Sequence, residues 1–69
     1  MIDLKKDLEA VREEVRRSPA TARVIAIRTD MTYKRALAAL NTLKGNGEAD
    51  WTAQHYDQHS YARVWGPTP

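Results

Sequence analysis

Two histidines and an aspartate alternate along one short stretch, as His55-x-Asp57-x-His59, and these residue types could hold a metal ion. Two histidines four residues apart, however, lack a defined third ligand and the hydrogen-bonding groups that would orient them. A contact to a phosphate group and an ordinary solvated loop are the other interpretations of His55, Gln58 and His59. The solvated loop is the favoured one, and we expect no bound metal.

The other residue types argue against catalysis. The chain has no cysteine, only two histidines and no Gly-rich loop that could cradle a phosphate. Its carboxylates are scattered along predicted helix faces and do not converge on a cleft. We therefore expect a protein that is not an enzyme and that needs neither a cofactor nor a small-molecule substrate.

Length and composition set further bounds. The chain has 69 residues, enough for one domain around one core, and without cysteine no disulfide stabilises it. Its hydrophobic fraction of 42%, with two Trp and three Tyr, is too high for a disordered chain. The apolar runs, such as residues 24–27 and residues 36–40, are too short for a transmembrane helix or a signal peptide. These features predict a cytoplasmic protein with no membrane partner.

The net charge of +2 is unevenly distributed along the chain. Residues 1–17 carry five basic and five acidic side chains, whereas residues 18–69 carry six basic and four acidic ones. The surplus of two positive charges therefore lies entirely in the later segment. It permits contact with nucleic acid without requiring it.

Hydrophobic periodicity predicts a helix over residues 3–17. Its apolar residues recur at spacings of four, three and four and form one stripe, composed of Leu4, Leu8, Val11 and Val15. Asp3 is suited to cap the first turn. The charged residues, Asp7 among them, are expected on a solvated outer face.

A second helix is predicted over residues 32–44. Thr32 is a good N-cap, and residues 45–47 (Gly-Asn-Gly) end the helix because they tolerate a positive φ. One side of this helix is expected to be buried, and it consists of Ala36, Ala39, Leu40 and Leu43.

Residues 21–29 are compatible with two structures. Thr21 as N-cap favours a short helix, whereas the β-branched residues and their alternation favour a strand. Residues 48–66 read as a β-hairpin whose connecting loop is residues 57–60. Trp51 and Trp65 are expected to pair across its strands and to anchor the small core.

This order of elements, together with Thr21-Ala22-Arg23-Val24-Ile25-Ala26, the stretch from Met31-Thr32 to Thr42-Leu43, and Gly47, resembles the winged helix-turn-helix family of DNA-binding domains. The resemblance covers residues 18–66, with helix 3–17 as support. It implies an α+β fold of three helices followed by a β-hairpin wing. It also favours a helix over residues 21–29 and places Met31 in the turn before the recognition helix.

The resemblance implies binding of double-stranded DNA by a transcriptional regulator. Helix 32–43 would enter the major groove, and the hairpin would contact the adjacent backbone. The residues assigned to DNA are Thr32, Tyr33, Lys34, Arg35, Ala38, Asn41, Lys44, His59 and Arg63. Such a small domain makes few phosphate contacts, so useful affinity calls for a homodimer or a second DNA-binding partner. The size is typical of regulators of phages or other prokaryotic elements.

Two other interpretations remain open. Leu37 and Ala38 replace polar residues that the family usually carries, and Asp30, Glu48 and Asp50 flank the DNA face and would repel phosphates unless they are turned away. Leu37, Ala38 and the low net charge favour a winged-helix module that binds protein and not DNA. The last interpretation is a different α+β module, in which residues 22–29 form a strand.

Overall fold

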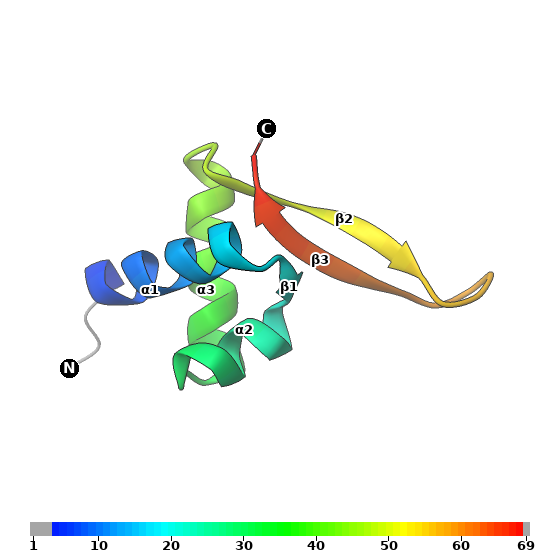
Figure 1. The fold of residues 1–69 in the computed structure, drawn as a ribbon, viewed down its shortest axis with the longest axis horizontal. Helices are drawn as coiled ribbons and strands as arrows, with labels where there is room; N and C mark the ends of the chain where they lie inside the picture. The colour runs from blue at the N-terminus through cyan, green and yellow to red at the C-terminus, as the bar shows by residue number, and fades with distance from the viewer. Residues whose placement is uncertain (1–3, 69) are drawn as a thin grey trace.

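The computed structural model describes residues 4–68, which form an α+β fold with three helices and a three-stranded antiparallel sheet. The elements are α1 (Leu4–Arg17), β1 (Ala20–Thr21), α2 (Ala22–Thr29), α3 (Tyr33–Gly45), β2 (Ala49–His55) and β3 (Tyr61–Pro67). The helices gather at one end, and the β2–β3 hairpin extends away from them as an arm (Figure 1). Over residues 4–68, no helix has the length and apolar character needed to cross a membrane.

Helix α1 buries most of the predicted apolar stripe. Val11 and Val15 are buried and Leu8 packs against the core, whereas Leu4 is exposed. The prediction that Asp7 lies on the solvated face is wrong: only 4% of this residue is exposed, because it packs toward α3 and pairs with a cation there. The predicted cap, Asp3, lies outside the described residues.

The segment that fitted both a helix and a strand is the helix α2. Thr21 has extended backbone angles and its hydroxyl accepts a hydrogen bond from the N–H of Val24 at 3.4 Å, so it acts as the N-cap. The buried side chains recur at helical spacing and are Ala22, Ile25 and Ala26. Burial of one helical face therefore decides between the two conformations that local propensity allowed.

The end of α2 is a Schellman motif built on Asp30. This residue adopts the left-handed conformation with φ 56°. The N–H of Met31 donates to the carbonyl of Ala26 at 2.9 Å, and the N–H of Asp30 donates to that of Ile27 at 3.2 Å. Met31 then packs partly buried against the core, as predicted for the residue between the two helices.

Helix α3 begins after Thr32, whose hydroxyl accepts a hydrogen bond from the N–H of Arg35 at 3.2 Å. The predicted buried face is confirmed, since its four residues are 0% exposed: Ala36, Ala39, Leu40 and Leu43. Three of the four, Ala39, Leu40 and Leu43, pack into one core with residues of α1 and α2 that include Val11, Val15 and Ile25. Helix α3 is thus fixed on one side and presents the other side to solvent.

The sheet joins the hairpin to the helical core. Its strand order is β1–β3–β2, and the predicted pairing of Trp51 with Trp65 is confirmed. Trp65 is 2% exposed and is the largest fully buried side chain. Strand β1 was not predicted, and it pairs only Ala20 with Trp65 and Thr21 with Val64. The arm beyond this point consists of β2 and β3 alone.

Candidate nucleic-acid interface

The solvent side of α3 carries three of the residues predicted to face a ligand. Lys34, Ala38 and Asn41 are exposed and lie opposite the buried face of the helix. Within residues 4–68, neither Lys34 nor Asn41 has an ion-pair or hydrogen-bonding partner for its side chain. An ammonium and an amide on this face are therefore available to an external partner.

Arg35, by contrast, is turned away from that face and toward α1. Its Nε donates to Oδ2 of Asp7 at 3.1 Å, and a terminal nitrogen donates to Oδ1 at 2.6 Å. The side-chain hydrogen bond to Asp7 raises the pKa of Arg35, aided by the charge of the carboxylate and opposed by desolvation. The structure thus places this predicted DNA-contacting residue in a contact that joins two helices.

Thr32 and Tyr33 lie at the start of α3. The Thr32 hydroxyl acts as the N-cap described above, so its oxygen is already engaged within the fold. Tyr33 is 53% exposed and lines a groove between the helices and the arm.

Trp51 brings together two predicted site residues from distant parts of the chain. The Arg63 guanidinium carbon lies 4.4 Å from its ring centroid, and the Lys44 ammonium nitrogen lies 5.6 Å from it. Cations this close to an aromatic face are attracted by the ring quadrupole. Trp51 therefore positions one cation from α3 and one from the arm at the junction of helix and hairpin.

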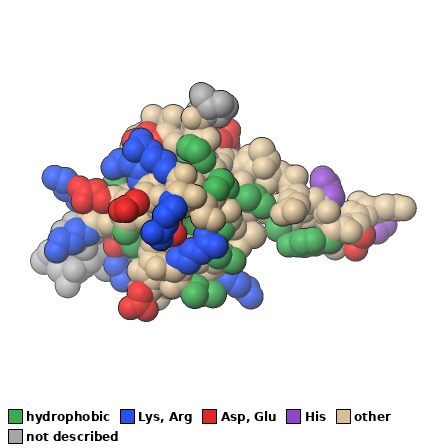
Figure 2. Space-filling model, viewed as in Figure 1, with side chains coloured by type: hydrophobic (Ala, Val, Ile, Leu, Met, Phe, Trp, Pro, Cys, Tyr) green, Lys and Arg blue, Asp and Glu red, His purple; other side chains and the backbone are tan. Residues whose placement is uncertain are grey.

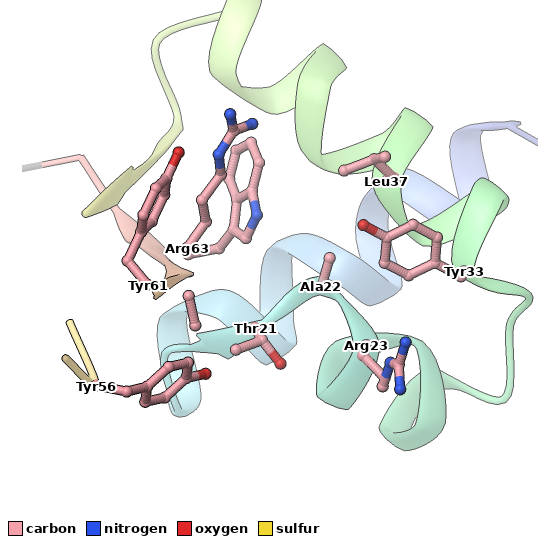
Figure 3. A pocket seen from close by; sticks show the side chains of 10 residues that line it. Thr21, Ala22, Arg23, Tyr33, Leu37, Tyr56, Tyr61 and Arg63 are labelled. Carbon is pink, nitrogen blue, oxygen red and sulfur yellow. The ribbon is translucent and has the colours of Figure 1, made fainter. Parts of the chain in front are cut away.

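A groove of about 590 Å³ runs beside this junction. In Figure 3 the arm contributes Tyr56, Tyr61 and Arg63 on one side, while Tyr33, Leu37 and Arg23 come from the helices on the other. Thr21 and Ala22 lie between the two sides, and Ala62 and Trp65 complete the lining. The groove thus joins α2, α3 and the hairpin in one concave surface.

The lining of this groove is aromatic and positively charged. Its residues include three tyrosines and two arginines but no aspartate or glutamate. On the face drawn in Figure 2, Lys and Arg side chains gather over the helices among several acidic ones, and the outer arm carries the two histidines. The groove is therefore a place where an anionic ligand meets no opposing carboxylate.

The tip of the arm is organised by Asp57. Its Oδ1 accepts hydrogen bonds from the backbone N–H of His59 at 2.7 Å and of Ser60 at 2.9 Å. The ring of His55 packs on that of Tyr61, with centroids 5.6 Å apart. Among residues 4–68, no three His, Cys, Asp or Glu side chains are grouped so that they could hold a metal ion. The structure uses Asp57 to shape the loop and leaves His59 exposed at its end.

Sequence reasoning did not assign Arg23, Tyr56 or Tyr61 to the site. Tyr61 and Arg63 alternate along β3 and so share one face, a pattern that interleaves aromatic and basic residues. That pattern could have indicated Tyr61 in addition to Arg63. Arg23 gives no local signal, because only the packing of α2 brings it to the groove.

Comparison with protein-family models, with curated protein sequences and with solved structures finds no match to this chain.

Proposed function

We propose that the protein is a winged-helix domain that binds double-stranded DNA as a transcriptional regulator. Helix α3 would enter the major groove, and the β2–β3 arm would act as the wing against the neighbouring backbone. The order of three helices and a β-hairpin is compatible with this layout. A homodimer would supply the additional phosphate contacts that such a small domain lacks.

One observation carries the proposal: the exposed face of α3 presents polar side chains without internal partners beside a projecting hairpin. Lys34 can donate to a phosphate or to the acceptors of guanine, Asn41 can pair with adenine, and Ala38 can contact a thymine methyl group. The major groove admits a helix of this kind because it is about 12 Å wide.

Of the three flanking acidic residues, Glu48 and Asp50 make contacts within the fold, whereas Asp30 is exposed at the end of α2. Glu48 is paired with Arg12, whose Nε lies 2.9 Å from a carboxylate oxygen, so its charge is largely compensated. Asp50 accepts a hydrogen bond from the backbone N–H of Trp51 at 2.8 Å. Beside them, Arg63 and Lys44 provide cations on the side of Trp51.

The direct test is a titration of the protein against random-sequence duplex DNA across a salt series. Binding should weaken steeply with salt, and Lys34→Ala should lower the slope of log K against log salt by about 1. Arg16→Ala is the matched control, because Arg16 is exposed on α1 and is not among the residues that line the groove. Absence of duplex binding at low salt would contradict the proposal and favour a winged-helix module that binds protein.

A further inference from the structure

The groove between α3 and the arm differs in character from the exposed face of α3. The face offers Lys34 and Asn41 on a convex helix, whereas the groove offers tyrosine rings and arginines on a concave surface. Its volume of about 590 Å³ lies in the range of small-ligand sites. A site of this size suits a ligand slimmer than double-stranded DNA.

The aromatic rings in the groove are accessible to a ligand. Tyr33 is 53% exposed, Tyr56 is 69% exposed and Tyr61 is 49% exposed. Tyr33 and Tyr61 come from opposite walls (Figure 3). Exposed aromatic side chains on a basic surface are the usual platform for unpaired bases, since every base has a face that can stack.

The two arginines are placed to meet phosphates. Arg63 is held at 4.4 Å from the Trp51 ring, so its charge is kept near the groove. Arg23 is exposed on the other wall, and within residues 4–68 its side chain has no ion-pair partner. No carboxylate lines the groove, so both charges remain available to an anion.

We propose that this groove binds a short single-stranded segment of nucleic acid, with bases stacked on Tyr33 and Tyr61 and the backbone phosphates paired with Arg23 and Arg63. The proposal goes beyond duplex binding by α3 and does not depend on it. A DNA end or a locally melted site would then engage both surfaces at once: the duplex on α3 and the unpaired strand in the groove.

The experiment compares three fluorescent probes: an oligothymidylate of about eight nucleotides, a blunt duplex, and the same duplex with an oligothymidylate overhang of equal length. Anisotropy is measured at low salt with the full chain. The free oligothymidylate should bind, and the overhang should bind more tightly than the blunt duplex. Tyr61→Ala should weaken oligothymidylate binding about 5- to 150-fold, because it removes one stacking ring.

Three variants separate stacking from charge and from folding. Tyr61→Phe keeps the ring and should bind the oligothymidylate about as well as the unmodified chain. Arg23→Ala should weaken oligothymidylate binding and reduce the salt dependence of that binding. Arg16→Ala changes charge equally outside the groove and should have little effect. Circular dichroism confirms that each variant keeps its helices.

The two proposals fail in different ways. Duplex binding without oligothymidylate binding overturns the groove proposal alone, as does equal affinity of Tyr61→Ala and the unmodified chain for the oligothymidylate. Oligothymidylate binding without duplex binding overturns the role of α3 and supports the groove. Failure of every probe to bind overturns both.

Discussion

Arg35 on α3 donates two hydrogen bonds to the carboxylate of Asp7 on α1, from Nε to Oδ2 at 3.1 Å and from a terminal nitrogen to Oδ1 at 2.6 Å. The carboxylate is almost fully buried, with 6% of its side chain exposed, whereas 37% of the arginine side chain reaches solvent. The pair sets α3 against α1, and so it fixes the orientation of the exposed face that carries Lys34 and Asn41.

Arg35→Ala is therefore expected to act on stability. It leaves a buried carboxylate without its cation, and the melting temperature should fall by several degrees in a circular dichroism melt. Arg16→Ala, on the exposed side of α1, should melt as the unmodified chain does. A variant at position 35 that melted normally but bound duplex DNA with a lower salt slope would instead identify Arg35 as a phosphate contact.

The ion pair between Arg35 and Asp7 also predicts how the stability of the fold depends on pH. The hydrogen bond that Arg35 donates to Asp7 raises the pKa of Arg35. A base whose pKa is raised in the folded state contributes stability that is complete below its unfolded pKa and is lost only as the pH rises through the folded one. Arg35 should therefore add no slope to stability between pH 7 and about pH 10. Urea unfolding of the unmodified chain and of Arg35→Ala across this range should give a constant difference.

Thr32 offers a test of whether its hydroxyl acts within the fold. Thr32→Ala removes the acceptor for the N–H of Arg35 and should cost about 1 kcal/mol of unfolding free energy. Thr32→Ser keeps the acceptor and should lose much less. Urea titration followed by circular dichroism measures both, and equal stability of the two variants would speak against the capping role.

Asp30 sits in a conformation that suits glycine better. Because its φ is 56°, Asp30→Gly should remove the left-handed strain and raise the unfolding free energy by up to about 1 kcal/mol. Asp30→Ala keeps a β-carbon in the same conformation and should be destabilising. The midpoints of urea unfolding rank the three chains, and the expected order is Gly, Asp, Ala.

The two tryptophans should respond very differently to truncation. Trp65 is 2% exposed, and Trp65→Ala should cost about 3–5 kcal/mol, a large part of the stability of so small a domain. Trp51 is half-buried, and Trp51→Ala should cost about 1–2 kcal/mol through lost packing and lost attraction to Arg63 and Lys44. Thermal melts compare them, and a larger loss at Trp51 would contradict the packing described.

The sequence predicted the elements whose signals are local. The apolar spacing of α1 and α3 and the cap Thr32 follow from neighbouring residues, and the pairing of Trp51 with Trp65 follows from a hairpin with a short loop. Residues 21–29 could not be assigned by propensity alone, because β-branched residues and an N-cap point to opposite structures. Their helix is selected by burial against α3, which is a long-range effect.

What could not be predicted depends on contacts between distant segments. Asp7 meets Arg35, 28 positions later, and nothing in the charged face of α1 distinguishes it from its neighbours. Strand β1 is two residues long and exists because β3 pairs with it. The groove arises in the same way, since Arg23 and Tyr61 come to line one groove only when the hairpin returns beside α2.

Because β1 pairs with only two residues of β3, the outer arm has less support than the helical part of the molecule. Beyond Val64 the arm is a two-stranded ribbon, and an isolated ribbon of this kind is only marginally stable in water. The arm can open locally while the helical body stays folded, so its amide hydrogens should exchange much faster than those of α3. We therefore expect the arm side of the groove to be flexible and the helical side to be rigid. Binding of a ligand in the groove would then cost ordering entropy in the arm alone.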